Sequence, residues 1–294
     1  MHRLLSPALV PSVSRRAAVR LGTGGIAAAL STRGLPSARA QEAPTTFVLV
    51  HGAWAGGWIW RDVVPLLRAA GHTVFATTAT GMGDRVHLAS PDITLDTHIT
   101  DVVNALGFED LHEVVLVGWG YGGMIISGVA HRVPERLARV VYLDADVPVD
   151  GENGWDAERY SAAARSADIW SGEDAGIPGF VTVDPYIEWI RASVPDPAIQ
   201  KWLFAKFVPQ PLPTYSQPIR LGLKDLAENP AAAAIPRAFV FCTENKGGAD
   251  VEHTVRTADR VRSDPGWIYR ELADTHFAPV NNALATAEVI LSLA

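Results

Sequence analysis

The sequence predicts an α/β fold, a mostly parallel sheet with helices on both faces and an inserted cap. Three observations carry this prediction. Short apolar runs typical of buried parallel strands alternate with stretches of helical spacing. A glycine-rich turn follows one such run, Val114 to Val117, and leads into a helix-like stretch from Met124 to His131. A segment rich in proline and tryptophan, 147–235, then interrupts the alternation between one strand and the next.

Six apolar runs are short enough to be strands and lack the polar alternation of a half-exposed sheet. They are residues 47–50, 74–76, 114–117, 140–143, 239–242 and 267–272. Helical spacing predicts helices at 60–70, 95–106, 124–131 and 283–293, with Thr94 as the N-cap of the second. Because strands and helices alternate, the strands are expected to run parallel.

The first forty residues are predicted to be an export signal of the twin-arginine type. Ser14-Arg15-Arg16 precedes a mildly apolar stretch from Ala17 to Leu30, and Ala38-Arg39-Ala40 has the small-x-small pattern of a cleavage site. The apolar stretch is too short and too rich in glycine to span a bilayer. We therefore expect a periplasmic or secreted protein that begins near Gln41, without stable membrane insertion.

The rest of the chain is predicted to form one α/β core, 41–146 and 236–294, with the cap inserted between its two parts. Open α/β sheets bind ligands at the carboxyl ends of their strands, which is where such an insertion would lie. The four tryptophans of the cap need apolar surface to cover; most are expected to pack the core of the cap itself, and one or two to line a pocket. The four are Trp155, Trp170, Trp189 and Trp202.

Composition narrows the range of partners. The net charge of −7 argues against nucleic acid or an anionic membrane surface. The single cysteine, Cys242, excludes an internal disulfide. The sequence has no metal-ligand spacing and no nucleotide-binding loop, so no cofactor or metal is expected. A small-molecule ligand or substrate remains as the expected partner, and the oligomeric state stays open, with a homodimer among the alternatives.

The turn after Val117 has the layout of a nucleophile elbow, G-x-S-x-G between strand and helix. Gly118 and Gly122 occupy the outer glycine positions, and Gly120 occupies the position of the serine. One interpretation is that glycine relaxes a strained turn once no nucleophile is needed. The other is that the vacated space holds a water, which a nearby base could activate.

A second glycine-rich loop, His51 to Gly57, follows the first strand. In a fold of this type such a loop supplies one backbone N–H of an oxyanion hole, and the residue after the elbow supplies the other. Ala53 and Tyr121 are the expected donors. The residues expected to form the oxyanion and substrate site are His51, Gly52, Ala53, Trp54, Trp119 and Tyr121.

His276 lies in a loop between the last strand and the final helix, where the general base of a Ser…Asp…His order stands. The acid that orients it is expected after the strand 239–242, at Glu244 or Asn245. Asp250, Asp144 and Asp146 are further candidates, the last two because they directly follow a strand. The sequence does not choose among them.

With these residues in place, the chain resembles the α/β-hydrolase superfamily, and within it the branch of small esterases, hydroxynitrile lyases and salicylate methyl esterases. The segments that carry the resemblance are F-V-L-V-H-G-A-W-A-G-G-W-I-W, V-L-V-G-W-G-Y-G-G-M, Y-L-D-A-D-V-P and D-T-H-F-A-P. The resemblance implies a serine nucleophile at Gly120, a histidine base at His276 and often an aspartate at Asn245. This chain departs from it at the first and third positions.

Three functions follow from this pattern. The first is an enzyme acting on a small, largely apolar ester or acyl compound, in which His276 activates a water or abstracts a substrate proton. The second is an inactive, exported protein that binds such a compound. The third is an inactivated variant of an ordinary serine esterase. All three use the same fold and the same pocket.

Overall fold

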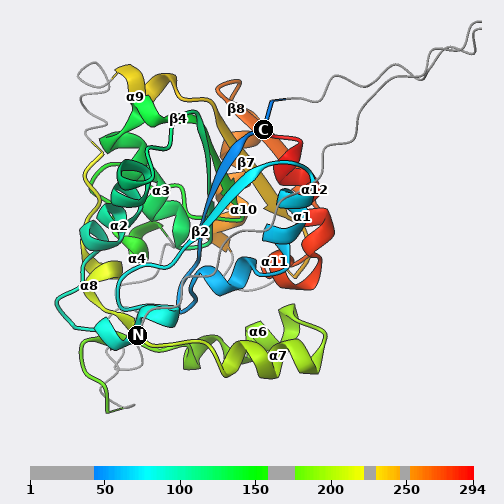
Figure 1. Ribbon diagram of the computed structural model, residues 1–294. Coiled ribbons are helices and arrows are strands. Elements are labelled where there is room, and N and C mark those ends of the chain that lie inside the picture. Colours follow the sequence, from blue (N-terminus) through cyan, green and yellow to red (C-terminus); the bar gives the residue numbers. More distant parts are fainter. Residues whose placement is uncertain (1–42, 158–175, 222–229, 246–251) are drawn as a thin grey trace, which may run out of the picture. The chain divides into compact units, whose positions relative to one another are not determined.

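A central sheet of six parallel strands organises the chain (Figure 1). The computed structural model describes residues 43–157, 176–221, 230–245 and 252–294. The strands are β1 (Thr46–Val50), β2 (Thr73–Thr77), β3 (Val114–Trp119), β4 (Leu137–Leu143), β7 (Arg237–Cys242) and β8 (Trp267–Leu272). Each contains the apolar run that predicted it, and β4 begins three residues earlier than expected. The predicted parallel sheet with helices between its strands is confirmed.

The order of strands across the sheet is β2-β1-β3-β4-β7-β8. The chain leaves β1 for the edge strand β2 and returns to β3 on the other side of β1, so the direction of winding reverses between β1 and β3. Crevices at the carboxyl ends of strands at such a reversal are where open α/β sheets bind ligands. The loops after β1 and β3, which carry the predicted oxyanion donors, meet at this point.

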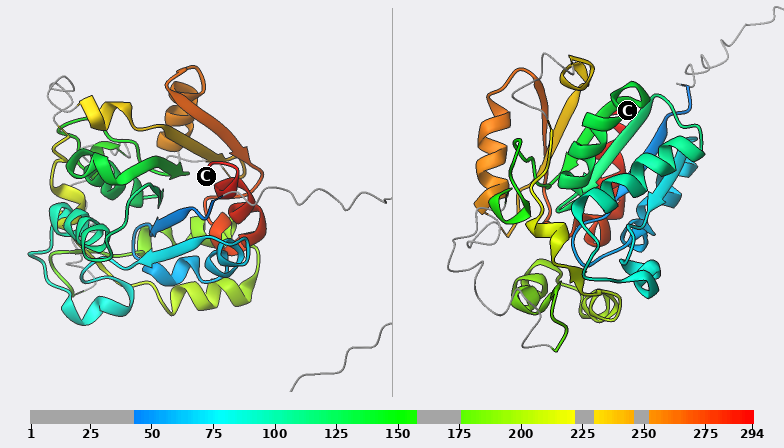
Figure 2. Two further views of the ribbon diagram at one scale, coloured as in Figure 1. Left: turned by 45° about the horizontal axis from the view of Figure 1, so that its top comes forward. Right: turned by 90° about the vertical axis from the view of Figure 1, so that its left-hand side faces the viewer.

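Helices cover the sheet on both faces (Figure 1). On one side α2 packs against α3, and on the other α1 packs against α12. Figure 2 shows α10 lying along β8 at the end of the sheet. The bounds are α1 (Val63–Ala69), α2 (Leu95–Phe108), α3 (Gly122–Arg132), α10 (Glu252–Arg262), α11 (Ala278–Asn281) and α12 (Ala283–Leu291), with 3-10 turns η1 (Gly57–Trp60), η2 (Gly83–Leu88) and η3 (Pro134–Arg136).

Two helices differ from the sequence prediction. The helix expected from residue 60 begins at Val63, because residues 57–60 form the separate turn η1. Helix α10 was not predicted, since its buried face within the described residues consists only of Thr254, Ala258 and Val261. By contrast, Thr94 caps α2 as predicted: its hydroxyl accepts from Thr97 N–H in a reciprocal capping box.

The segment between β4 and β7 contains short elements in place of the strand–helix alternation. They are α4 (Gly154–Ala157), β5 (Phe180–Val181), η5 (Asp184–Tyr186), α6 (Ile187–Ser193), α7 (Pro197–Phe204), β6 (Gln210–Pro211), α8 (Pro213–Ser216) and α9 (Pro230–Ala234). Strands β5 and β6 form an antiparallel pair of their own. In Figure 1, α6 and α7 lie together below the sheet. We refer to residues 147–235 as the insertion; Trp170 lies outside the described residues.

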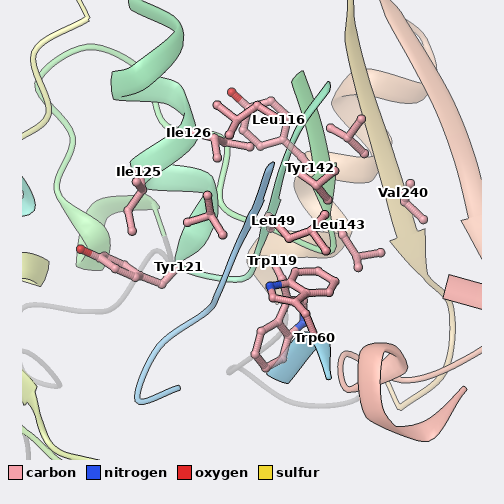
Figure 3. Packing of buried hydrophobic residues seen from close by; sticks show 14 of the residues in the cluster. Leu49, Trp60, Leu116, Trp119, Tyr121, Ile125, Ile126, Tyr142, Leu143 and Val240 are labelled. Atoms are coloured by element: carbon pink, nitrogen blue, oxygen red, sulfur yellow. The ribbon is translucent and has the colours of Figure 1, made fainter. Parts of the chain in front are cut away.

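The core lies between the sheet and its helices, and it extends into the insertion. Figure 3 shows side chains from β1, β3, β4, β7 and α3 meeting in it, among them Leu49, Leu116, Leu143, Val240 and Ile126. Ile190 and Leu203 of the insertion are also fully buried. Burial of this apolar surface is the main stabilising contribution to the fold, at roughly 25 cal/mol per Å².

The chain separates into two units, Met1–Glu42 and Ala43–Ala294, and the fold above is that of the second. The predicted export signal lies outside the described residues. Within the part that is described, none of the helices has the length and apolar character needed to cross a membrane.

Candidate active site

The turn between β3 and α3 places Gly120 at the carboxyl end of the sheet. Its φ of 54° lies in the left-handed region, which glycine adopts without the steric cost that a side chain imposes. Close packing fixes the rest of the turn: a Cβ on Gly123 would lie only 2.0 Å from the carbonyl oxygen of Asp146. Figure 3 shows Trp119 and Tyr121, on either side of Gly120, pointing to different sides of the turn.

His276 lies directly against Gly120. A Cβ built on Gly120 would be 3.1 Å from Nε2 and 3.2 Å from Cε1 of the histidine ring. Nδ1 of the same ring donates to Oδ2 of Asp144 at 2.8 Å. Because a carboxylate only accepts, this contact places the proton of a neutral ring on Nδ1 and leaves Nε2 as the basic nitrogen, the one nearest Gly120.

Asp144 is fully buried and is held on both oxygens. Oδ2 binds His276, and Oδ1 accepts from the backbone N–H of Cys242 at 3.2 Å. Its φ of 44° lies in the left-handed region, which aspartate tolerates better than most residues. Strand register explains the position: Trp119 pairs with Leu143, so the residues that follow, Gly120 and Asp144, leave the sheet side by side.

The prediction that Glu244 or Asn245 orients the histidine is wrong, because Asp144 binds His276 instead. The Asn245 side chain donates to the Ser193 hydroxyl at 2.5 Å, and the Glu244 backbone N–H donates to the carbonyl of Asp274 at 2.9 Å. Both are exposed and neither contacts His276. Strand β7 extends past the end of β4, so the loop after it turns towards α6, and Asp144 occupies the place beside the histidine.

Two other carboxylates had been candidates for the same position. Asp146 lies two residues beyond Asp144, and its backbone N–H donates to the carbonyl of Gly120 at 3.1 Å. It is therefore part of the packing of the turn. Asp250 lies outside the described residues.

Aromatic rings enclose the histidine. The ring of Trp119 lies 4.8 Å from that of His276, and the ring of Trp189 in α6 lies 5.4 Å away. The indole N–H of Trp119 also donates to the backbone carbonyl of His276 at 2.7 Å. The His276 side chain is 16% exposed, so solvent reaches it only in part.

The loop that carries His276 is tied to the insertion through the end of α6. The carbonyl of Ser193 accepts from the Thr275 hydroxyl at 2.7 Å and from the Asn281 amide at 2.9 Å. Asn281 also donates to Thr275 and to Asp274. These bonds satisfy a carbonyl at a helix end that has no partner within the helix, and they fix both flanks of the histidine.

The predicted oxyanion donors, Ala53 and Tyr121, have backbone N–H groups that donate to no acceptor among the described residues. Gly52 brings the two loops together, since a Cβ there would lie 2.7 Å from the ring of Trp119. Each loop thus contributes an available donor at the reversal point of the sheet. Such amides stabilise negative charge that develops on a carbonyl oxygen.

The His51 side chain holds two backbone segments together, a role that was not predicted from the sequence. Its Nε2 accepts from the Ala79 N–H at 3.1 Å, so Nδ1 carries the proton and donates to the Gly52 carbonyl at 2.7 Å. Burial lowers the pKa of His51 to about 4. The ring is therefore neutral near pH 7 and is bound on both nitrogens by backbone groups, in contrast to the predicted substrate contact.

A second buried histidine, His98, was missed by sequence reasoning. Its Nε2–H donates to the Thr80 carbonyl at 3.0 Å, so Nδ1 accepts from the Tyr121 hydroxyl at 3.1 Å. Burial lowers its pKa to about 3. A signal was available: His98 lies among the apolar positions of α2, between Leu95 and Val102, where a polar side chain needs a buried partner.

No group of three or more histidine, cysteine, aspartate or glutamate side chains suited to a metal occurs among the residues that the structure describes. The site brings together a buried carboxylate, a histidine beside a glycine, and two backbone donors. Together they can remove a proton and stabilise an oxyanion.

Comparison with known proteins bears on the family and the fold. The model of the Alpha/beta hydrolase family matches residues 47–289. The chain is 52% identical over 107 residues to the carbendazim hydrolyzing esterase of Nocardioides sp. (strain SG-4G), a match of 36% of this chain and 44% of that protein. It is 35% identical over 103 residues to the alpha-hydroxynitrile lyase of Arabidopsis thaliana, a match of 35% of this chain and 40% of that protein. Both matches cover less than half of the relative.

Among solved structures, tomato methylketone synthase I in complex with 2-tridecanone is similar to this chain with a TM-score of 0.68 at 18% identity. The similarity covers 85% of this chain and 98% of that one. At this level of identity it supports the fold.

Proposed function

Because the chain belongs to the alpha/beta hydrolase family, we propose that it acts on a small, largely apolar ester or acyl compound, with His276 as general base and a water in place of a serine nucleophile. One observation carries the proposal. His276 is held by Asp144 at 2.8 Å, and its Nε2 lies 3.1 Å from the position that a Cβ of residue 120 would occupy. A base is thus oriented towards a position that has no side chain.

The geometry suits a water at this position. A Cβ on Gly120 would already be 3.1 Å from Nε2, so a water occupying the space of the missing side chain would be within hydrogen-bond reach of the base. General base catalysis of this kind contributes roughly 10²–10⁴-fold. A chain without the nucleophile would therefore be slower than a serine esterase.

The proposed reaction is a direct hydrolysis. The water oxygen bonds to the carbonyl carbon while its proton passes to Nε2 of His276, which Asp144 stabilises as an imidazolium. The N–H groups of Ala53 and Tyr121 bind the oxyanion that forms. When the tetrahedral intermediate collapses, the bond to the leaving alkoxide or phenoxide breaks and His276 returns the proton to that oxygen.

The names of relatives favour the same class of compound. One relative is described as an esterase, and the solved neighbour holds 2-tridecanone, a small apolar ketone. The aromatic rings around His276 offer an apolar wall of the kind that small-molecule sites use.

The test is hydrolysis of 4-nitrophenyl acetate by the unaltered chain, by His276→Ala and by Gly120→Ser. We expect slow turnover by the unaltered chain and its loss in His276→Ala. In Gly120→Ser the φ of 54° and the close histidine ring both oppose a side chain. We therefore expect Gly120→Ser to be less stable by about 1–3 kcal/mol and to gain a serine mechanism only if the ring shifts by a few tenths of an ångström.

The second candidate is a protein that binds such a compound without converting it, and the absence of a nucleophile at Gly120 favours it. Turnover in Gly120→Ser alone would support this candidate and contradict the first. Turnover by the unaltered chain that survives His276→Ala would contradict the proposed mechanism.

Export and the cap belong to the proposal as well. Ser14-Arg15-Arg16 and Ala38-Arg39-Ala40 support cleavage before Gln41. N-terminal sequencing of protein recovered from the periplasm of a bacterial host should begin at Gln41. Recovery of the intact chain from the cytoplasm alone would contradict export. The insertion, 147–235, would act as the cap, since its Trp189 and Ser193 contact the histidine and its loop.

A further inference from the structure

Trp54 has a backbone conformation that its side chain disfavours. Its φ is 56°, in the left-handed region that bulky residues rarely enter. Such a conformation persists only where surrounding contacts determine it, and it is concentrated at functional sites. Trp54 directly follows Ala53, whose N–H is one of the two proposed oxyanion donors, so contacts that hold Trp54 in place also restrain the loop that carries that N–H.

Among the described residues, three hydrogen bonds hold Trp54, and all three come from the insertion. Its N–H donates to Oε1 of Gln210 at 3.1 Å, its carbonyl accepts from Val208 N–H at 3.0 Å, and its indole N–H donates to the Val181 carbonyl at 3.2 Å. Val181 and Gln210 are paired residues of the strands β5 and β6. Of the three bonds, only the one to Gln210 uses a side chain of the insertion.

Gln210 is in turn fixed by a buried neighbour. It is fully buried, and its Nε2 donates to the Thr214 hydroxyl at 2.8 Å, which itself donates to the Pro211 carbonyl at 2.7 Å. The amide of Gln210 is therefore oriented with its oxygen towards Trp54. A glutamine with both ends of its amide engaged in this way is stiffer than its length suggests.

The same group of side chains reaches the second proposed donor residue. Burial raises the pKa of the Tyr121 phenol, and the neighbouring Thr214 side chain opposes part of that rise. On its other side the Tyr121 hydroxyl donates to His98. Thr214 is thus adjacent both to the glutamine that holds Trp54 and to the tyrosine that follows Gly120.

We propose that Gln210, supported by Thr214, is a positioning residue that holds the loop His51–Gly57 in the conformation that presents the Ala53 N–H. The catalytic part of this inference rests on the proposed function, in which the Ala53 N–H binds the oxyanion. In that case a residue of the insertion positions an oxyanion donor. The structural part of the inference, the restraint of the loop, is independent of any activity.

The test compares Gln210→Met with the unaltered protein and with Gln200→Met. Methionine matches glutamine in length and cannot accept the Trp54 N–H. Gln200 is a matched control in the same insertion, because its amide donates to the carbonyls of Arg191 and Val194 and does not touch the loop. The measurements are hydrogen–deuterium exchange of the peptide 51–57, exchange of 114–119 as an internal reference, and kcat and KM for 4-nitrophenyl acetate.

We expect Gln210→Met to raise exchange in 51–57 about tenfold or more while 114–119 stays unchanged, and Gln200→Met to leave both unchanged. Where turnover is present, kcat should fall by about tenfold or more at an unaltered KM, because the oxyanion is bound mainly in the transition state. Unaltered exchange of 51–57 in folded Gln210→Met would overturn the inference.

A second variant covers a failure of Gln210→Met to fold. Thr214→Val keeps the shape of Thr214 and removes the hydroxyl that orients Gln210, so it should raise exchange in 51–57 several-fold. No increase would also overturn the inference. If exchange rises as expected but the unaltered protein shows no turnover, the positioning role stands and the proposed function fails.

Discussion

Nδ1 of His276 lies 2.8 Å from Oδ2 of Asp144, although the two residues are 132 positions apart in the chain. Asp144 is fully buried, and Cys242 N–H binds its other oxygen. A buried carboxylate held on both sides cannot turn away from the ring. The contact therefore fixes which ring nitrogen is basic and where it points, independently of what residue 120 contributes.

The first prediction concerns this contact. Asp144→Asn keeps the size of the side chain but removes the charge that stabilises an imidazolium, so kcat for 4-nitrophenyl acetate should fall by about 10²–10⁴-fold. The same loss should occur in the Gly120→Ser background. Urea denaturation serves as the control that the variant is folded. A kcat within twofold of the unaltered chain would show that Asp144 does not support the base.

The carboxylate that orients His276 could not be identified from the sequence. The sequence located the histidine and the elbow, because each follows directly on an apolar run. It could not choose Asp144 over Glu244 or Asn245, since all of them follow strands. In the folded sheet Trp119 pairs with Leu143, and this register places Asp144 beside the turn that contains Gly120. The register of two strands depends on the folded sheet and could not be predicted from the two apolar runs alone.

The second prediction concerns the loop of His276. Thr275→Val is close in shape and removes the hydroxyl that binds the Ser193 carbonyl and accepts from Asn281. Removal leaves a buried acceptor with one donor fewer, at a cost of about 1–3 kcal/mol in the free energy of unfolding. Chemical denaturation measures that cost.

The matched control for the loop is Thr100→Val, at an exposed hydroxyl of α2 that donates to the Asp96 carbonyl and accepts from the Arg132 guanidinium. It should change the free energy of unfolding by less than about 0.5 kcal/mol. Equal decreases in the free energy of unfolding for the two variants would show that the hydrogen bond from Thr275 to the Ser193 carbonyl stabilises the protein no more than an exposed one does.

The third prediction compares two glycines. A Cβ at Gly123 would lie 2.0 Å from the Asp146 carbonyl oxygen, whereas one at Gly107 would meet nothing within 4 Å. Gly123→Ala should therefore destabilise the protein by several kcal/mol through backbone displacement. Gly107→Ala, near the end of α2, should stabilise it by about 0.5–1 kcal/mol. Thermal unfolding measures both, and a stable Gly123→Ala would contradict the described turn.

The fourth prediction is a loss of stability in mild acid. Burial lowers the pKa of His98 to about 3 and that of His51 to about 4, against 6.5 for an unperturbed histidine. Below pH 6.5 the unfolded chain binds protons that the folded chain does not. The free energy of unfolding should then fall with decreasing pH, by about 2 kcal/mol per histidine between pH 7 and pH 5.

Urea denaturation at the two pH values checks this effect. His98→Asn removes one titrating group, so the difference between pH 7 and pH 5 should shrink by about 2 kcal/mol. His112→Asn, at an exposed histidine, should leave it unchanged. An undiminished difference in His98→Asn would mean that His98 is not held neutral in the folded protein.

Gln210, Thr214 and Ser193 had no sequence signal at all. Each is buried and binds a residue more than fifty positions away or supports one that does. Their polar side chains look like ordinary loop residues, because the insertion has no hydrophobic period from which burial can be predicted. Polar positions within a regular apolar pattern, such as His98, can be recognised, whereas polar positions in irregular segments cannot.

The central claim, that His276 activates a water beside Gly120, is tested most directly by rapid-mixing kinetics of 4-nitrophenyl acetate hydrolysis. Samples would be the unaltered chain and His276→Ala, purified identically, with mass spectrometry after exposure to a phosphonate that labels active serines. We expect linear product release without a burst, loss of turnover in His276→Ala and no covalent adduct. A burst with an adduct on the unaltered chain, or turnover that survives His276→Ala, would contradict it.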